Sequence, residues 1–341
     1  MIPAFNVRKK SEIYIGPLAE LLPGLLPEGR VVVVCDAAID RLYGSMLTGH
    51  DRALIGSGES IKTLQTVETL YRRFIELGVD RRTFILGMGG GIVTDIAGFA
   101  ASTYMRGLPF GFVPTTLMGQ VDASVGGKNG VNVDGYKNMA GTFTQPQFVI
   151  CDPALLRSLS DREFRAGLAE VVKTAVIADA GLFARLERAS FEALRRNTDL
   201  LSDAISASIR IKADIVDRDE RETGERRKLN LGHTLAHAIE KCSSRMSHGE
   251  AVAVGTALIA DVAVKLGVLS PGDRDRIVGL LLALGFELTP PVDMRRLLKE
   301  VGKDKKSEGD ILRIVLPVGI GDCRVHPLPV AEFRSLCEGL G

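Results

Sequence analysis

Three of the five histidines in the chain fall within sixteen residues, at positions 233, 237 and 248. His233 and His237 are four residues apart in the segment LNLGHTLAHAIE, so they share one face of a predicted helix. His248 opens the segment HGEAV, just before another apolar helical segment. Two imidazoles and a carboxylate leave one coordination position open, which is the pattern of a catalytic zinc-type site. Small neighbours such as Gly232 and Ala236 suit a buried helix and favour this role over a pair of surface histidines.

The carboxylate that would complete this site is not fixed by spacing. Glu170 and Lys173 lie three residues apart in GLAEVVK and would place a ligand beside an ammonium on one helix face. The alternative for that pair is a surface ion pair, which contributes little to stability. Glu222, Glu225 and Glu250 are rival candidates.

A glycine-rich turn, LGMGGGIVTD at residues 86–95, separates an apolar strand-like segment from an apolar helical one. Glycines allow a pyrophosphate to approach the backbone, and the N-terminus of the following helix offers free N–H groups and a positive dipole end. The spacing is not GxGxxG, because position 92 is Ile, so this is not the standard dinucleotide-binding fingerprint. Three consecutive glycines still favour phosphate binding over a turn that merely needs glycine. Residues 57–62 and the pair Thr115 and Thr116 are weaker signals.

The segment DASVGGKNGVNVDGYKN at residues 122–138 is rich in glycine and carries Lys128 and Lys137. It lacks the periodicity of a helix or a regular strand, so it predicts an irregular hairpin or loop, where function often resides. Lysines on such loops suit phosphate or carboxylate ligands. Further basic candidates, each alone more typical of a surface charge, are Arg106, Lys212, Arg226 and the run 303–306.

The elements expected around these motifs differ between the two halves of the chain. Strands at 30–36, 82–87, 110–113 and 148–152 alternate with helices at 61–77 and 92–104, which indicates a parallel α/β sheet. From about residue 161 a helical period dominates. The expected helices there span 162–177, 182–194, 198–219, 228–241, 249–266, 274–284 and 294–301, and a strand or hairpin arm is expected at 310–316. We therefore predict an N-terminal domain over 1–157 and a helical C-terminal domain over 158–341.

The composition excludes several functional classes. Lys and Arg number 43 against 42 Asp and Glu, so bulk attraction to nucleic acid or an acidic membrane is not indicated. No segment approaches the ~18–20 apolar residues of a membrane span, and the N-terminal segment does not resemble a secretory signal. The five cysteines are scattered without a CxxC pair, which fits a reducing cytoplasm and argues against a cysteine-ligated metal.

Together these segments resemble the 3-dehydroquinate synthase family. The matching stretches, in family order from about residue 57 to 306, are GGGIVTD, YMRGLPFGFVPTTL, QVDASVGGKNGVN, YKNMAGTF, GLAEVVK, IKADIV, DERETGERRKLNLGHTLAHAIE, HGEAVAVG and KDKK. Ser57 stands where the family often has Asp, and Thr94 stands where Gly is common. Neither difference removes a group that the chemistry needs.

The resemblance implies a role for each matching residue. The metal, zinc or cobalt, would be held by Glu170, His233 and His248. NAD would lie against Ser57, Gly58, Glu59, Lys62, Gly89, Gly90, Gly91, Ile92, Val93, Thr94, Asp95, Thr115, Thr116, Lys128 and Lys137, and against Leu155, Leu156, Arg157 and Ser158. The substrate phosphate would contact Lys128, Asn138, Asn230, His237, one lysine of the pair 305 and 306 (Lys306 is favoured), and Arg106 of a neighbouring subunit. The substrate carboxylate would contact Lys212 and Arg226, while Asp122, Lys173 and Glu222 would contact hydroxyls or order the site.

The implied fold is a Rossmann-like α/β NAD-binding domain followed by an all-α domain, with the active site in the cleft between them. The implied enzyme is a homodimer that converts 3-deoxy-D-arabino-heptulosonate 7-phosphate into 3-dehydroquinate in the shikimate pathway. Oxidation by NAD, β-elimination of phosphate, reduction and aldol closure would follow one another. The alternatives are another sugar-phosphate cyclase, an enzyme for an amino analogue of the substrate, a glycerol-dehydrogenase-type alcohol dehydrogenase, and a non-catalytic NAD-binding protein.

Overall fold

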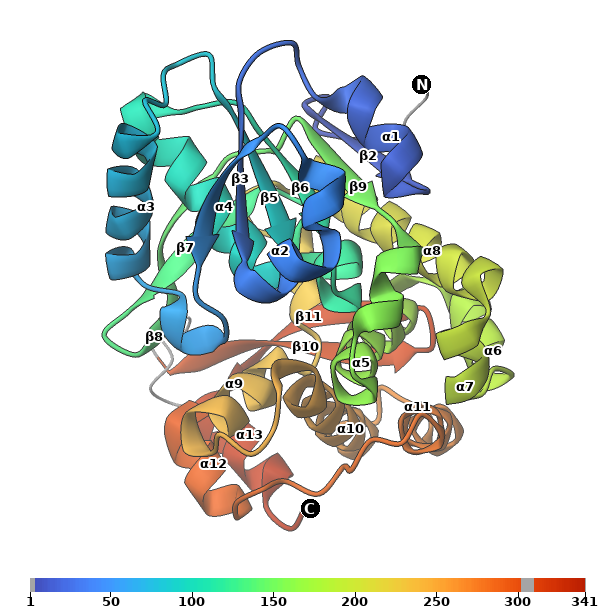
Figure 1. Cartoon of the computed structure of the whole chain (residues 1–341). Helices are drawn as coiled ribbons and strands as arrows, with labels where there is room; N and C mark the ends of the chain where they lie inside the picture. The colour runs from blue at the N-terminus through green and yellow to red at the C-terminus, as the bar shows by residue number, and fades with distance from the viewer. Residues whose placement is uncertain (1–3, 302–309, 341) are drawn as a thin grey trace. The chain divides into compact units, whose positions relative to one another are not determined.

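The computed structural model describes residues 4–301 and 310–340, and the chain divides into two compact units, Met1–Leu159 and Ser160–Gly341. We call them unit 1 and unit 2 and describe each by itself. Figure 1 shows both units and labels most of their helices and strands.

Unit 1 is built around a seven-stranded sheet in the order β1-β2-β9-β6-β5-β3-β4. Its strands are β1 (Phe5–Val7), β2 (Ser11–Ile15), β3 (Val31–Asp36), β4 (Asp51–Ile55), β5 (Phe84–Gly89), β6 (Phe110–Pro114) and β9 (Phe148–Cys151). All pairs are parallel except β1 with β2. The central strands read as continuous apolar runs because both faces of a parallel sheet are covered. This confirms the predicted parallel α/β domain.

The strand order reverses between β3 and β5, because the chain runs outward from β3 to β4 and then returns to the other side of β3. In open α/β sheets, ligands bind beyond the carboxyl ends of the strands at such a reversal. The glycine-rich turn follows β5 at this edge. The helices of unit 1 are α1 (Leu18–Leu25), α2 (Ala37–Tyr43), α3 (Leu64–Glu76) and α4 (Gly91–Thr103), with short helical turns η1 (Gly44–Leu47), η2 (Glu59–Ile61), η3 (Tyr104–Arg106), η4 (Gly119–Ala123) and η5 (Pro153–Ser158).

The segment expected as an irregular hairpin forms an antiparallel pair, β7 (Lys128–Val133) with β8 (Tyr136–Phe143), whose register shifts between Val131 and Val133. Gly130 and Gly141 face each other in this pair, and a side chain on either would collide with the opposite backbone. The glycines of the segment therefore serve close strand pairing as well as flexibility.

Unit 2 is mostly helical, as predicted. Its helices are α5 (Asp161–Ala178), α6 (Ala180–Glu187), α7 (Phe191–Arg196), α8 (Thr198–Arg218), α9 (His233–Cys242), α10 (His248–Lys265), α11 (Pro271–Ala283), α12 (Met294–Val301) and α13 (Val330–Cys337), with a turn η6 (Glu225–Asn230). Capping boxes start the two long helices that matter most for the site, Ser160 with Glu163 at α5 and Ser247 with Glu250 at α10. Such boxes satisfy the free N–H groups of a first turn.

Unit 2 differs from the expectation in three respects, and the first is that the helix expected over 182–194 is divided into α6 and α7. The helix expected over 228–241 is interrupted, because Gly232 takes a left-handed conformation (φ 76°) and α9 begins only at His233. A side chain at Gly232 would press on Thr256 of α10, so the break and the close packing require the same glycine. The unit is also not all-α: the strand expected at 310–316 pairs as β10 (Ile311–Gly319) with β11 (Asp322–Pro329).

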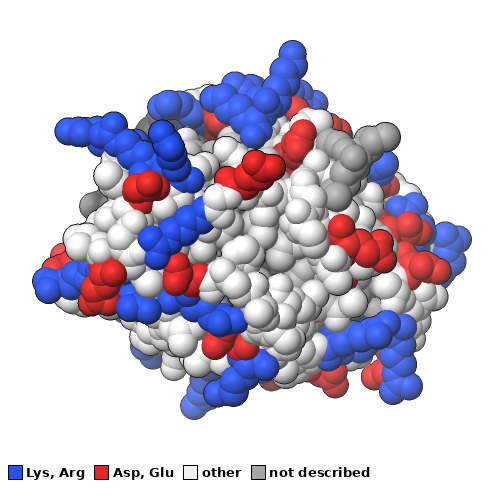
Figure 2. Space-filling model, turned by 45° about the horizontal axis from the view of Figure 1, so that its top comes forward, with Lys and Arg blue, Asp and Glu red and all other residues white. Residues whose placement is uncertain are grey.

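Among the described helices, none has both the length and the apolar character that a membrane crossing requires. On the face that Figure 2 shows, basic and acidic side chains are interspersed rather than gathered into a field of one sign. This distribution agrees with the nearly balanced charge of the whole sequence.

Candidate metal centre and cofactor site

Three helices of unit 2 bring one carboxylate and two imidazoles together. Glu170 lies on α5, His233 opens α9 and His248 opens α10, and one ligand atom from each lies within 4.8 Å of the others. Oε1 of Glu170 is 3.8 Å from Nε2 of His233 and 3.5 Å from Nε2 of His248. The structure thus gathers the three residues that the resemblance implied as metal ligands.

The second nitrogen of each imidazole is held by an acceptor. Nδ1 of His233 lies 3.0 Å from the carbonyl oxygen of Leu231, and Nδ1 of His248 lies 3.1 Å from Oε1 of Glu240. When Nδ1 carries the proton and donates to these oxygens, the lone pair of Nε2 points toward Glu170. Such contacts orient metal-bound histidines in proteins. Sequence reasoning missed Glu240, although it stands seven residues after His233 and therefore on the same helix face.

Burial and neighbouring charges shift the pKa values of the two imidazoles and the carboxylate in different directions. Burial, aided by the nearby Lys173 ammonium, lowers the pKa of His233 to about 3, so this imidazole is neutral with a free lone pair. Burial opposes the charging of His248, but the carboxylates of Glu170 and Glu240 outweigh it and raise the pKa of His248 to about 9. Burial likewise opposes the ionisation of Glu170, yet Lys173 and the two imidazoles hold its pKa well below the usual value.

A close approach of two helices fixes the distance between two of these groups. Gly249 of α10 lies so near the carbonyl of Ala166 on α5 that a methyl group there would collide with the backbone. Gly249 adjoins His248, and Ala166 precedes Glu170 by one helical turn. The missing side chain therefore lets His248 come within reach of Glu170.

The donor set fits a divalent metal. Oε1 of Glu170 is buried and has no hydrogen-bond partner of ordinary geometry, although a buried carboxylate oxygen normally requires one. Two nitrogens and one oxygen suit zinc or a similar transition metal and leave a position for a substrate oxygen. A bound cation would replace the proton on His248 and give Oε1 of Glu170 a partner.

Replacing Glu240 with Ala should weaken zinc binding by about 10–100-fold, because His248 loses the acceptor that orients its ring. Glu240→Gln keeps an acceptor oxygen and should lose less. Competition for zinc with a fluorescent chelator measures both constants. Equal affinity of Glu240→Ala and the wild type would remove this carboxylate from the centre.

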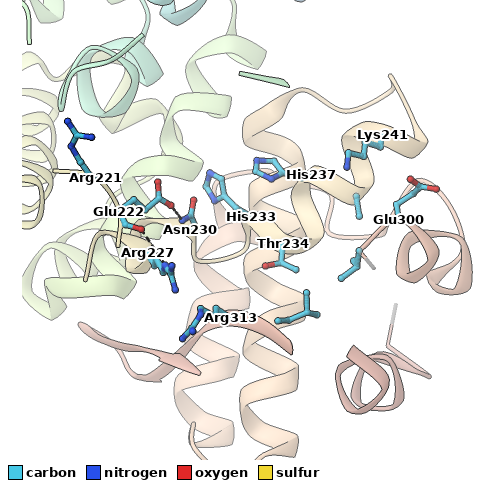
Figure 3. Close-up of a pocket in the computed structure, with 13 residues that line it drawn as sticks. Arg221, Glu222, Arg227, Asn230, His233, Thr234, His237, Lys241, Glu300 and Arg313 are labelled. Carbon is cyan, nitrogen blue, oxygen red and sulfur yellow. Dashed lines mark hydrogen bonds between the residues drawn. The ribbon is translucent and has the colours of Figure 1, made fainter. Parts of the chain in front are cut away.

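A cavity of about 350 Å³ adjoins the cluster, and Figure 3 shows the residues that line it. His233 and His237 reach it from α9, with ring centroids 5.5 Å apart. Asn230 and Glu222 also line it, and the amide of Asn230 donates to the carboxylate of Glu222. Three residues assigned to the substrate from the sequence, Glu222, Asn230 and His237, therefore line one cavity beside the metal ligands.

Two buried cations lie on neighbouring elements of unit 2. Lys212 of α8 is 8% exposed and Arg226 of η6 is 2% exposed, and these two elements pack against each other. The guanidinium of Arg226 donates to the carbonyl oxygen of Glu220 at 2.5 Å. Buried cations of this kind are costly unless partners or a ligand compensate them.

The other carboxylate candidates from the sequence are engaged elsewhere. Glu250 caps α10 and pairs with Arg162 at 2.8 Å. Glu225 pairs with Arg218 at 3.4 Å, while Glu222 bonds Asn230. Geometry thus favours Glu170 among the four.

In unit 1 the glycine-rich turn joins β5 to α4. A side chain on Gly89 would come within 2.6 Å of Val93, and one on Gly91 within 2.9 Å of Ala123. Gly90 caps α4 without a side-chain bond, so the first-turn N–H groups of this helix stay available for an anion. This geometry can bind a phosphate group.

A buried lysine connects that turn to the β7–β8 hairpin. The ammonium of Lys62, 6% exposed, lies 2.5 Å from Oδ2 of Asp95 on α4 and 2.6 Å from Oδ1 of Asn138 on β8. Asn132 extends the network, since its Oδ1 accepts from the N–H of Asn138 and its Nδ2 donates to Glu59. Four residues implied for the cofactor or the substrate, namely Glu59, Lys62, Asp95 and Asn138, thus belong to one hydrogen-bonded group.

The remaining predicted residues of unit 1 occupy several elements. Thr115 and Thr116 follow β6, and the hydroxyl of Thr116 accepts from the N–H of Gly119. The turn η5 holds residues 155–158, and the hydroxyl of Tyr43 on α2 donates to the carbonyl of Leu155 at 3.1 Å. Ser57 and Gly58 precede η2. Helix α4 contains Ile92, Val93 and Thr94, and η4 contains Asp122. Lys128 opens β7, whereas Lys137 on β8 and Arg106 in η3 are exposed.

Arg106 and Met105 both have positive φ angles (70° and 49°), which side chains seldom adopt outside special turns. Arg106 is therefore presented on a tightly turned, exposed loop. Lys305 and Lys306 lie outside the described residues.

Sequence comparisons match most of the chain. The sequence models described as 3-dehydroquinate synthase N-terminal and C-terminal match residues 52–166 and 167–307. A 3-dehydroquinate synthase from Geobacter metallireducens is 45% identical over 340 residues, which cover 94% of this chain and 94% of that protein.

Structural comparisons give two related cyclases. A 2-epi-5-epi-valiolone synthase from Streptomyces hygroscopicus subsp. jinggangensis, solved with NAD+ and Zn2+ bound, matches with a TM-score of 0.88 and 29% identity over 96% of this chain and 95% of that one. A 2-deoxy-scyllo-inosose synthase, solved with carbaglucose-6-phosphate, NAD+ and Co2+, matches with a TM-score of 0.87 and 26% identity over 95% of each chain.

Proposed function

Because this chain belongs to the 3-dehydroquinate synthase family, we propose that it converts 3-deoxy-D-arabino-heptulosonate 7-phosphate into 3-dehydroquinate and phosphate. The observation that carries the proposal is the gathering of Glu170, His233 and His248 beside a cavity that His237, Asn230 and Glu222 line. This cluster supplies a metal-binding centre next to polar groups suited to a phosphorylated polyol. The identity of 45% to a 3-dehydroquinate synthase supports the same reaction.

We assign NAD to unit 1, at the edge of the sheet where the strand order reverses, and zinc or cobalt to the cluster of unit 2. The two solved cyclases carry NAD+ with Zn2+ or Co2+, which supports both assignments. When bound, NAD would accept a hydride from the substrate alcohol and later return it, and the metal would polarise the oxygen of that alcohol.

The side chains of this protein would bind and orient the substrate. Lys173, buried beside Glu170, would stabilise negative charge on the reacting oxygen. Lys212 and Arg226 would bind the carboxylate. Lys128, Asn138, Asn230 and His237 would bind the phosphate, joined by Arg106 of a second copy and by Lys306, while Asp122 and Glu222 would orient hydroxyls.

The order of events follows from the chemistry of the substrate. Once C5 is a ketone, the neighbouring C–H becomes acidic, and phosphate can leave by β-elimination. The phosphate held by Lys128, Asn138 and His237 would itself take that proton. Reduction at C5, ring opening and intramolecular aldol closure then give the carbocycle, and NAD is regenerated in each turnover.

The alternatives make different demands on the site. Cyclases that form 2-deoxy-scyllo-inosose or 2-epi-5-epi-valiolone act on substrates without a carboxylate and do not need both Lys212 and Arg226. A glycerol-dehydrogenase-type enzyme would accumulate NADH and would not need so many cations around one centre. A non-catalytic NAD-binding protein would not need the metal cluster.

We also propose a cytoplasmic homodimer. The presentation of Arg106 on an exposed turn supports a contact with a second copy. The free cysteines support a reducing compartment.

The proposed function is tested by incubating the purified protein with 3-deoxy-D-arabino-heptulosonate 7-phosphate, catalytic NAD and zinc or cobalt. We expect phosphate release matched by 3-dehydroquinate, no accumulation of absorbance from NADH, and loss of the reaction with a chelator. Absence of phosphate release, or steady NADH formation from a simple polyol, would contradict the proposal.

A further inference from the structure

The carboxylate of Asp219 sits at the centre of a ring of hydrogen-bond donors. Helix α8 ends at Arg218, and Asp219 follows it as the C-cap residue. Its Oδ1 accepts from the N–H of Thr223 at 3.0 Å and from the hydroxyl of Thr223 at 3.2 Å. Its Oδ2 accepts from the N–H of Gly224 at 2.8 Å and from the N–H of Arg226 at 3.0 Å.

The three backbone N–H groups that bond this one carboxylate form an anion-binding concavity. Elsewhere such concavities bind phosphates, whereas here the chain fills it with its own carboxylate. The ring also stabilises an unfavourable backbone, because Glu222 has a φ of 60°, in the left-handed region that side chains disfavour. Without the hydrogen bonds to Asp219, little would offset the cost of this backbone conformation at Glu222.

The loop that Asp219 organises carries the side chains of the site. Arg226 is held by its backbone and by its side chain, since its N–H donates to Asp219 and its guanidinium donates to the carbonyl of Glu220. Glu222 accepts from the amide of Asn230 through its side chain and from Nε of Arg227, at 3.3 Å, through its carbonyl. Loss of the hydrogen bonds between the carboxylate of Asp219 and this loop would therefore displace Glu222 and Arg226 together.

We propose that Asp219 is a positioning residue that holds the loop of residues 220–230 so that Arg226 and Glu222 meet the substrate, a role that rests on the function proposed above. Asp219 itself touches no reacting group. Its effect should appear in substrate binding, because the metal ligands come from α5, α9 and α10 and the cofactor residues from unit 1.

The ring keeps Asp219 ionised throughout the neutral range. Burial opposes ionisation, but the N–H donors of Gly224, Thr223 and Arg226 outweigh it and lower the pKa of Asp219 to about 2. The contact is therefore a permanent constraint and not a pH switch at neutral pH.

The test compares Asp219→Asn with Asp214→Asn, an equivalent change at an exposed position on the same helix. The amide of Asn keeps one acceptor oxygen but turns an NH₂ group toward donors. We expect Asp219→Asn to raise the KM for the sugar-phosphate acid by about 10–100-fold, with zinc stoichiometry and the Kd for NAD unchanged. Asp214→Asn should match the wild type. Normal KM in Asp219→Asn, or a raised KM that accompanies lost zinc, would overturn the proposal.

A double-mutant cycle separates positioning from a general loss of structure. Because Asp219 acts in part through Arg226, the combined KM effect of Asp219→Asn and Arg226→Met should be clearly smaller than the product of the two separate effects. Multiplication of the two effects would show that they are independent and would sink the proposal. Should Asp219→Asn fail to fold, Asp219→Glu keeps the charge but displaces it by one methylene, and the same cycle applies.

Hydrogen exchange distinguishes failure of this inference from failure of the proposed function. Amide exchange in a peptide covering residues 220–230 should quicken at least about tenfold in Asp219→Asn and stay unchanged in Asp214→Asn. If the wild type releases no phosphate from the substrate, the proposed reaction is wrong while this exchange result still reports on the loop. If exchange is unchanged, Asp219 does not hold the loop, whatever the reaction.

Discussion

Replacing Glu170 with Gln should abolish zinc binding and phosphate release. Glu170 is 1% exposed and its Oε1 is the only described carboxylate oxygen that lies near Nε2 of both His233 and His248. Gln keeps the shape but removes the negative charge that a dication requires. We expect zinc affinity to fall by at least about 100-fold and phosphate release by on the order of 10³-fold, since the metal contributes several kcal/mol to the reaction.

The same change should destabilise the metal-free protein, because Glu170 is also the partner of Lys173. That ammonium is 2% exposed, and breaking a buried ion pair by removing one member costs about 3–5 kcal/mol. The double variant Glu170→Gln, Lys173→Met removes both members of the buried pair and should recover much of the stability without recovering zinc binding. Urea denaturation of the chelated proteins and zinc titration measure the two effects separately.

The matched control is Glu192→Gln, which removes one partner of the exposed pair between Glu192 and Arg196 on α7. Its effect on stability should stay below about 1 kcal/mol, because solvent screens exposed pairs. Zinc bound with wild-type affinity by Glu170→Gln would exclude Glu170 as a ligand and reopen the choice among the carboxylates of unit 2.

Much of the fold could be predicted because the elements have distinct local patterns. The run of valines at 31–34 shows a strand covered on both faces, and the spacing of His233 and His237 shows that they share a helix face. The expected strands and most expected helices appear in the structure. The sheet order could not be predicted from these patterns, because the residues of one strand do not identify the distant strand with which it pairs. The break at Gly232 was missed for a similar reason, since it depends on contact with α10.

The candidate site was predictable to different degrees. The two histidine motifs indicated a metal from the residues alone, whereas Glu170 was one of four candidates until the family resemblance selected it. Glu240 and Asp219 were missed because each acts on another residue and carries no chemistry of its own. Glu240 had a detectable signal in its helical spacing. Asp219 had none, because its role depends on the left-handed backbone of the loop that follows.

Replacing Lys62 with Met should raise the KM for NAD and the KM for the phosphorylated substrate together. Its ammonium joins Asp95, beside the glycine-rich turn, to Asn138 on the hairpin. Removal takes the cation from Oδ1 of Asn138 and from Asp95, so both proposed binding segments lose the contact that joins them. We expect both constants to rise at least about tenfold, whereas Lys10→Met, at an exposed lysine of the same unit, should change neither.

A pH dependence gives this prediction an independent readout. Burial raises the pKa of Asp95 above its usual value of 3.8, and Lys62 opposes that rise. In Lys62→Met the opposition is gone, so the pKa of Asp95 should rise further. A carboxyl whose pKa is raised by folding destabilises the folded state once it ionises, and stability is lost as the pH rises from the unfolded to the folded pKa.

The stability deficit of Lys62→Met should therefore be small near pH 4 and reach its full size, about 3 kcal/mol, at neutral pH. Adding Asp95→Asn to Lys62→Met removes the ionising group and should remove this pH dependence. Urea denaturation of the three proteins at several pH values measures it. A stability deficit that is the same at every pH would show that Lys62 stabilises unit 1 by packing and not by compensating the charge of Asp95. A rise in only one of the two KM values would show that Lys62 does not join the cofactor segment to the substrate segment.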